Sequence, residues 1–357
     1  MTKLDGRPYD DLLTQKGYRG FPSLAFMDAE GEVLAEPKDR SVDSFAKALD
    51  ALSRIDAVRA RAEGGDARAA VELLLIEYDL GRVEDEDFAA KAADLRAGAS
   101  ADQLARIDQI NIDLEAAALI NEANRGDREA ALEGLLAMLA DGRRPSASTR
   151  YAGSFWSLLG QHAQSEGDTA LLRQVAAGIL ADFPADEDWR SSAERYDEMA
   201  AAFDERDALL ARQADGESGL EAKILIIEAR YRTTTFEGFR ERLEAARAVA
   251  TDEEQAELRQ LDADLEYEHL AESFWEGDRD EIGARLFDLL EGDGPTPGAD
   301  SAGLIARPLF SWSRSSEDPE LIERVAAVLR SRFEGEATML RLADDLTKMA
   351  EDLRAKG

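Results

Sequence analysis

The chain has 357 residues, of which 76 are acidic and 43 basic, so its formal net charge is −33. A field of this sign repels phosphate backbones and anionic membrane surfaces, which argues against nucleic acid and lipid headgroups as partners. The absence of cysteine excludes disulfides, thiolate metal sites and cysteine nucleophiles within these residues.

The first fifty residues predict a small α/β unit. A short helix is expected over residues 8–16, with Gly17 as its stop. An apolar strand over residues 21–27 is followed by a turn at 28–31, where an Asp can bond the local backbone and a Gly can take a positive φ. A partner strand follows at residues 32–35. A helix then begins after Ser41, with an apolar stripe at Val42, Phe45, Leu49 and Leu52.

This order of elements, together with the Gly17-to-Ser23 run before the first strand, resembles the C-terminal half of the thioredoxin family over about residues 2–52. The resemblance implies that Pro22 is a cis proline and that the backbone of Phe21 binds a substrate peptide. The Cys-x-x-Cys half of that family would have to precede Met1. A truncated or misplaced start is the preferred explanation, because a central strand left unpaired is prone to aggregate. The alternative is an ordinary β-hairpin packed on the helical part, with Pro22 trans.

The rest of the chain predicts amphipathic helices joined by short turns. Glycine can end one helix in the left-handed conformation while the following aspartate caps the next. Five dipeptides lie at the expected turns between helices: Gly65-Asp66, Gly126-Asp127, Gly167-Asp168, Gly277-Asp278 and Glu317-Asp318. Apolar residues recur at helical spacing after four of these turns, at Leu132, Leu135, Leu139, Leu172, Val175, Ile179, Ile282, Leu286, Leu289, Ile322, Val325 and Leu329.

The spacing of the turns resembles a degenerate tetratricopeptide-like array, since two pairs lie about one two-helix repeat apart and the other intervals break the period. An irregular helical bundle stays open as the alternative. The fold class expected is therefore mainly α, with a partial thioredoxin-like segment over residues 1–55 and a helical body over 56–357. Possible sub-boundaries fall at the loops 142–148, 215–219 and 292–298.

The sequence offers few candidates for chemistry. His162 and His269 stand alone on two expected helices, where packed or solvated histidines are the preferred interpretation. Four alternating acids resemble a cation loop, but the leucine period around them predicts a helix that scatters them about its axis: Asp262, Asp264, Glu266 and Glu268. The acids at 84–87 are interpreted as a helix start. No catalytic set, metal site or cofactor is expected.

Aromatic residues precede three of the turns. Their preferred role is packing between helices, and the alternative is a peptide-binding groove anchored by Trp156, Trp275 and Trp312 with nearby arginines. The function expected is that of a non-catalytic protein-binding or scaffold protein with a protein or peptide partner. The alternative is a thiol-disulfide oxidoreductase or redox chaperone whose cysteine pair lies upstream of Met1.

The expected compartment depends on whether a segment upstream of Met1 is missing. No targeting segment is predicted, because residues 1–5 lack the apolar core of a secretory signal. No membrane insertion is predicted either, because the longest aliphatic run covers only residues 224–227. As written, the chain would be cytoplasmic. A periplasmic or secreted location applies if an upstream signal is missing.

Overall fold

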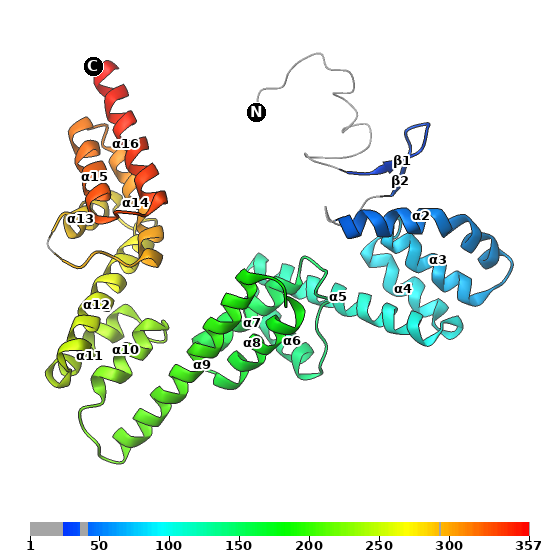
Figure 1. Ribbon diagram of the computed structural model, residues 1–357, viewed down its shortest axis with the longest axis horizontal. Helices are drawn as coiled ribbons and strands as arrows, with labels where there is room; N and C mark the ends of the chain where they lie inside the picture. The colour runs from blue at the N-terminus through cyan, green and yellow to red at the C-terminus, as the bar shows by residue number, and fades with distance from the viewer. Residues whose placement is uncertain (1–23, 36–41, 293, 357) are drawn as a thin grey trace. The chain divides into compact units, whose positions relative to one another are not determined.

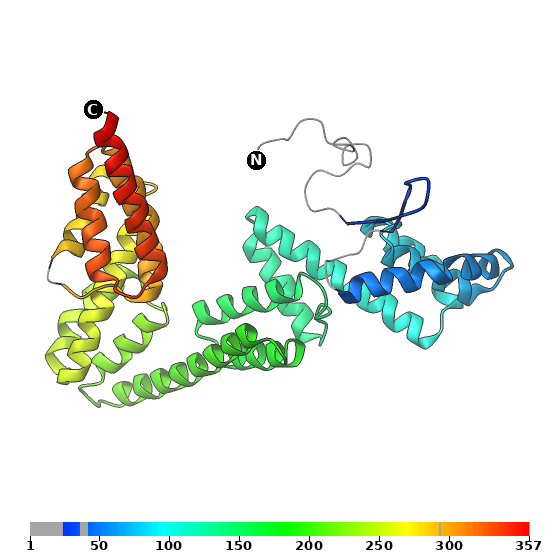
Figure 2. The same ribbon diagram turned by 45° about the horizontal axis from the view of Figure 1, so that its top comes forward.

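The computed structural model of the protein describes residues 24–35, 42–292 and 294–356. Figure 1 and Figure 2 show two views of it. The expected helix over residues 8–16, and with it Phe21 and Pro22, lies outside the described residues. The described chain is mainly helical and forms two compact units, which divide between Ser157 and Leu158.

The elements of the first unit are β1 (Phe26–Met27), β2 (Val33–Ala35), α2 (Val42–Glu63), α3 (Ala67–Asp79), α4 (Asp85–Leu95), the 3₁₀ turn η1 (Arg96–Gly98), α5 (Ala101–Arg125) and α6 (Arg128–Ala140). Helix α7 (Ala152–Glu166) crosses from the first unit into the second. The second unit continues with α8 (Thr169–Asp182), α9 (Glu187–Ala214), α10 (Glu221–Arg230), α11 (Phe236–Val249), α12 (Asp252–Ser273), α13 (Arg279–Glu291), α14 (Ala299–Ser315), α15 (Pro319–Arg332) and α16 (Ala337–Lys356).

The strand–turn–strand element is present as an antiparallel hairpin of β1 and β2. Its turn follows the expected chemistry: Asp28 Oδ1 accepts hydrogen bonds from the backbone of Glu30 and Glu32, and Gly31 has a φ of 82°. Phe26 packs edge-on against Phe45 of α2, with 5.8 Å between ring centroids. The hairpin is therefore tied to the first described helix by an aromatic contact.

The buried face of α2 differs from the expected stripe. Val42 and Leu49 are exposed, whereas Ala48, Ile55 and Val58 are buried. These buried residues share one hydrophobic cluster with β2 and α3. The expected segment boundary at residues 55 and 56 thus falls inside α2, because that part of the helix belongs to the core that the hairpin also enters.

All five predicted turn sites separate helices. Asp66, Asp168, Asp278 and Asp318 each accept backbone N–H bonds at the start of the following helix, and Asp127 is the one of the five whose side chain does not. The apolar positions predicted after the turns are buried or half-buried. Short-range capping chemistry therefore places the helix boundaries correctly. The loops 142–148, 215–219 and 292–298 also lie between helices.

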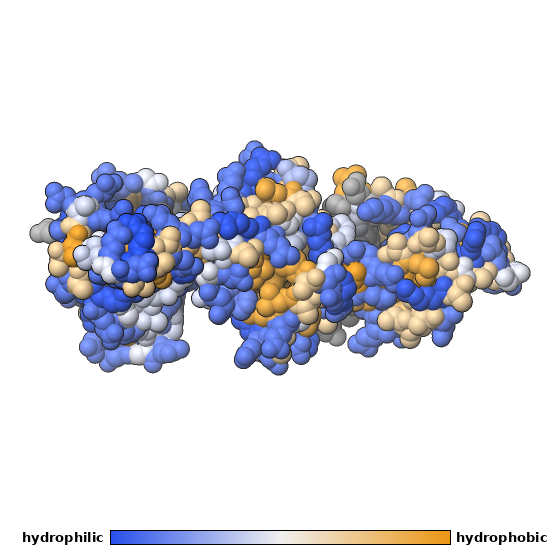
Figure 3. Space-filling view, turned by 90° about the horizontal axis from the view of Figure 1, so that it is seen from below, coloured by the Kyte–Doolittle hydropathy of each residue, from blue (hydrophilic) through white to orange (hydrophobic). Residues whose placement is uncertain are grey.

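Several successive helices of the second unit pack as pairs, namely α8 with α9, α10 with α11 and α15 with α16. The last pair lies side by side in both ribbon views. Among the described helices, none has both the length and the apolar character needed to cross a bilayer. Hydrophilic residues cover most of the face shown in Figure 3, as expected of a chain with 33% charged residues.

Helix α12 belongs to two hydrophobic cores. Its first half contributes Leu258, Leu261 and Leu265 to a cluster with α10 and α11. Its second half contributes Tyr267 and Leu270 to a larger cluster with α13, α14, α15 and α16. The change from one core to the other falls between Leu265, which packs in the first cluster, and Tyr267, which packs in the second.

Candidate functional site

The candidate site lies on α12, where the two cores meet. The helix begins with a capping box, in which Thr251 Oγ1 accepts from the Glu254 N–H and the Glu254 carboxylate accepts from the Thr251 N–H. Its acidic first turn also complements the positive end of the helix dipole. The start of α12 is thus fixed by its own sequence, which sets the rotational position of every later side chain.

The alternating acids of α12 point to different neighbours, as the helical period predicted. Asp264 Oδ1 accepts from the Gly298 N–H at 2.8 Å, at the start of α14. Glu268 accepts from Ser301 Oγ at 2.8 Å and pairs with Arg232. No group of His, Asp and Glu in the described residues is arranged to hold a metal ion. These carboxylates therefore connect α12 to neighbouring segments through hydrogen bonds and an ion pair.

Two acids form a network with arginines from α11 and α13. Asp262 Oδ2 accepts from Arg247 at 3.2 Å, and Arg240 Nε lies 2.8 Å from Asp262 Oδ1 without hydrogen-bond alignment. Glu266 bridges Arg240 at 2.7 Å and Arg285 at 2.8 Å. Burial raises the pKa of Asp262, and the two arginines beside it oppose that rise. Each carboxylate is thus paired with two arginines, while Asp262 Oδ1 accepts no hydrogen bond from the described residues.

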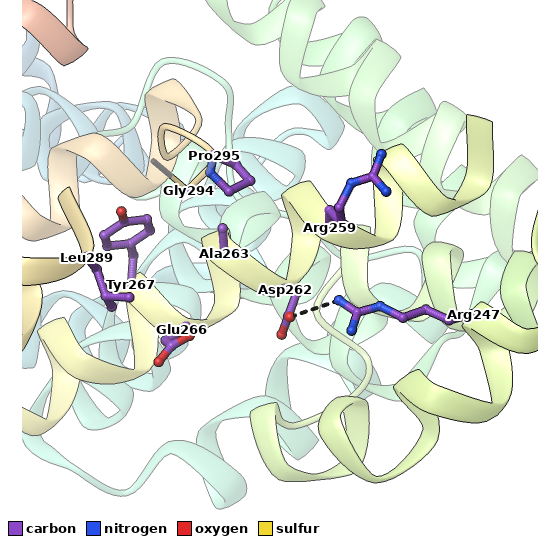
Figure 4. Close-up of a pocket in the computed structure, with 9 residues that line it drawn as sticks. All are labelled: Arg247, Arg259, Asp262, Ala263, Glu266, Tyr267, Leu289, Gly294 and Pro295. Atoms are coloured by element: carbon purple, nitrogen blue, oxygen red, sulfur yellow. Dashed lines mark hydrogen bonds and ion pairs between the residues drawn. The ribbon is translucent and has the colours of Figure 1, made fainter. Parts of the chain in front are cut away.

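A cavity of about 210 Å³ lies beside this network. Figure 4 shows it between α12, the Gly294–Pro295 loop, Leu289 of α13 and Arg247 of α11. Ala263 lies between Arg259 and Tyr267 along α12, one turn from each, and its methyl group leaves a notch between their longer side chains.

The loop that forms one wall of the cavity is held from two sides. Gln260 of α12 donates to the Thr296 carbonyl at 2.8 Å, and Arg332 of α15 donates to the Gly294 carbonyl at 3.0 Å. Asp264 holds the end of the same loop through Gly298. Because both helices fasten the loop, the wall has a defined position next to the notch.

Two polar groups at the cavity have unused donors. Arg259 is exposed, and no carboxylate within the described ranges pairs with it. Tyr267 is only 2% exposed, yet no described residue hydrogen-bonds to its hydroxyl. Figure 4 shows that hydroxyl directed toward the loop at Gly294 and Pro295. Burial raises the pKa of Tyr267 to about 12, so the phenol stays protonated and able to donate.

The three tryptophans singled out in the sequence lie in different environments. Trp156 is 1% exposed and Trp312 is 8% exposed, so both are packing residues rather than surface anchors. Trp275, just beyond the end of α12, is 50% exposed. It packs edge-on against buried Phe274, and the Arg279 guanidinium lies 5.3 Å from its ring centroid.

The histidines follow the preferred interpretation. His162 and His269 are half-buried, and His269 stacks on Phe236 with 4.6 Å between centroids. The acids at 84–87 begin α4, as predicted. Sequence reasoning missed Arg259 and Tyr267, although their spacing of four residues on either side of Ala263 is the signal that places all three on one helix face.

Comparison of the chain with protein-family models, curated proteins and solved structures finds no match.

Proposed function

We propose that this chain is a non-catalytic protein-binding or scaffold protein, in which helical hairpins present an aromatic anchor to a protein partner. The observation that carries the proposal is Trp275. A tryptophan that is half exposed, backed by the buried ring of Phe274 and flanked by Arg279, has the composition of an interface hot spot. Its position just after α12 sets it on a well-packed helix end rather than on a long loop.

The state of the charged groups supports binding over chemistry. Asp262 and Glu266, the acids nearest the cavity, are each held by two arginines. A general acid or base needs a carboxyl that is free to exchange its proton with a substrate. Scaffold function needs only a fixed surface, which ion pairs between neighbouring helices provide.

The N-terminal hairpin is assigned to the same proposal as a thioredoxin-like remnant. The strand, turn, strand and helix order of residues 26–63 supports this assignment, as does the Asp28 turn. A tetratricopeptide-like stacking of the later helix pairs is likewise part of the proposal, supported by the packing of α8 on α9 and α15 on α16.

The test is site-specific photocrosslinking. A benzophenone amino acid replaces Trp275, and a matched control places it at Leu210, which is 39% exposed on α9. We expect one protein from a lysate of the source cells to crosslink at position 275 and not at position 210. That protein, once purified, should bind the wild-type chain saturably and bind Trp275→Ala about 30-fold less tightly, as removal of a hot-spot residue predicts. Equal binding by Trp275→Ala, or equal crosslinking at both positions, would contradict the proposal.

A further inference from the structure

We propose that the Trp275 surface binds a basic, arginine-containing segment of a protein partner, and that a partner guanidinium contacts both the exposed indole and the carboxylates beside it. This inference rests on the binding function proposed above, because it takes Trp275 as the anchor and adds the chemistry of the group that Trp275 contacts. The partner class follows from the charge around the indole, from two acids at a helix end and from the exposed part of the ring.

The turn from α12 to α13 carries the charge that selects a basic partner. Residues 272–281 contain five acids and one arginine, a net charge of −4, whereas the whole chain, with −33 over 357 residues, averages about −1 for a stretch of that length. All six of these charged residues are exposed. A surface field of this sign attracts cations and repels acidic surfaces, so it disfavours an acidic partner.

Most of these acids are not neutralised by the protein itself. Farther back on α12, Glu257, Glu266 and Glu268 each pair with an arginine of another segment. Asp278 uses its carboxylate to cap α13. The remaining four acids of the turn form no side-chain ion pair or hydrogen bond within the described parts of the chain: Glu272, Glu276, Asp280 and Glu281. Their charge is available to a cation from outside the chain.

Two of the four lie where their own helix disfavours them. Asp280 and Glu281 are in the first turn of α13, where acids stabilise the positive end of the helix dipole, so the fold accounts for them. Glu272 is in the last turn of α12, which contains no basic residue, and Glu276 follows three residues after the helix ends. The negative end of the dipole repels both carboxylates. The helix gains nothing from these two acids, and a cation from outside the chain is the partner that their charge favours.

The indole offers an aromatic face to the same cation. Trp275 is next to Glu276, and it is three residues after Glu272 across a C-cap, Phe274, that keeps helical backbone angles, so Glu272 and Trp275 share one side of the helix end. The Arg279 guanidinium lies 5.3 Å from the ring centroid, and half of Trp275 remains exposed. A guanidinium can stack on an aromatic ring and bond a carboxylate through its planar fork, which favours arginine over lysine in the partner.

The experiment is a titration of the full chain into a short fluorescent peptide of arginine, leucine and glycine, followed by fluorescence anisotropy. The same peptide with citrulline in place of each arginine is the matched control, because citrulline keeps the shape of the side chain and loses its charge. At about 50 mM salt we expect the arginine peptide to bind with a Kd of about 100 µM or tighter, and the citrulline peptide to bind at least about tenfold more weakly.

Two matched double substitutions locate the site. Glu272→Gln/Glu276→Gln should weaken binding of the arginine peptide about tenfold, the loss expected for a hydrogen bond to a charged group, and leave the citrulline peptide unchanged. The control, Glu194→Gln/Glu198→Gln, removes two exposed acids of α9 that also form no ion pair in the described chain, and should weaken binding less than about twofold. Trp275→Ala should remove the binding of the arginine peptide. Helical circular dichroism melting checks that each variant is folded.

Equal affinity for the two peptides, no measurable binding of the arginine peptide, or unchanged affinity in the folded Glu272→Gln/Glu276→Gln variant would overturn the inference. So would an equal loss in both double variants, which would mean that only the net charge of the chain attracts the peptide. The binding function itself is judged by the crosslink at position 275 and the partner that it identifies. If that partner binds Trp275→Ala more weakly but binds Glu272→Gln/Glu276→Gln as it binds wild type, the binding function stands and the basic partner is excluded.

Discussion

Arg332, in the last turn of α15, donates from Nε to the Leu290 carbonyl across 2.7 Å and so closes the end of α13 from a different helix. Its guanidinium also donates to the carbonyls of Gly292 and Gly294. The last carbonyls of a helix have no partner within the helix, and here one side chain satisfies those of Leu290 and Gly292 as well as that of Gly294 in the following loop. One arginine therefore ends α13 and holds the wall of the cavity.

Replacing Arg332 by Met should lower the free energy of unfolding by about 1.5–3 kcal/mol, because charge-assisted hydrogen bonds to the part-buried Leu290 carbonyl and to two exposed carbonyls are lost while the aliphatic stem is kept. Urea denaturation measures this. Arg341→Met, at an exposed position on α16, is the matched control and should stay within about 0.5 kcal/mol of wild type. Equal effects of the two substitutions would show that the α13 contacts contribute nothing.

Alanine substitutions at Gly283 and Gly303 should change the stability of the protein in opposite directions. A Cβ at Gly283 would overlap the side chain of Trp312, whereas a Cβ at Gly303 meets nothing within 4 Å. Gly283→Ala should destabilise the protein by about 1–3 kcal/mol through overpacking. Gly303→Ala should stabilise the protein by about 0.4–1 kcal/mol. Alanine restricts the unfolded chain more than glycine does, and it is the better helix former in a helix interior. Thermal melts of the two variants measure these changes. A stabilised Gly283→Ala would contradict the close packing of Trp312 on Gly283.

Substitutions can distinguish an aspartate that caps a helix through its side chain from one that precedes a helix without a side-chain hydrogen bond. Asp278 accepts from the Asp280 and Glu281 N–H groups, so Asp278→Ala should cost about 1 kcal/mol and Asp278→Asn almost nothing. Asp127 begins α6 without a side-chain hydrogen bond, and Asp127→Ala should cost less. Chemical denaturation of the three variants provides the comparison. A loss in Asp278→Asn as large as in the alanine variant would exclude capping as the cause.

Asp264 should give the stability a dependence on acid pH. Burial raises its pKa above the ordinary value of 3.8, and the Gly298 N–H opposes this. A carboxyl with a raised pKa binds its proton more tightly in the folded state, so its contribution to stability is present below about pH 4 and is lost as pH rises through the folded pKa. Asp264→Asn keeps an oxygen for the Gly298 N–H and removes the titration.

The measurement for Asp264 is unfolding at about pH 4 and about pH 7. The stability of Asp264→Asn relative to wild type should be more favourable at the higher pH. A relative stability that falls between the two pH values would mean that the pKa of Asp264 is lowered rather than raised.

The chain as written should show no disulfide reductase activity in an insulin-reduction assay. Exchange begins with attack by a thiolate, and there is no cysteine to form one. Turnover by the purified protein, with a reductant-only reaction as the control, would contradict this.

Local chemistry made much of the fold predictable. A turn such as Gly167-Asp168 is recognised from sequence because its cap bonds a backbone group only three residues away. The acids of α12 could be placed around a helix axis for the same reason, since the leucine period around them is local. The Asp28 turn was predicted from two residues and is present.

Burial was decided only by distant contacts. Trp156, Trp275 and Trp312 precede similar turns, yet one is half exposed and two are buried; Trp312 packs where Gly283, on another helix, leaves room for its ring. The cavity likewise exists because α12 leaves one core and enters another beside a loop held by Arg332. Capping and periodicity are determined by residues within a few positions, so the sequence alone specifies them. Packing and unpaired donors such as the Tyr267 hydroxyl depend on which helices meet, and only the tertiary structure determines that.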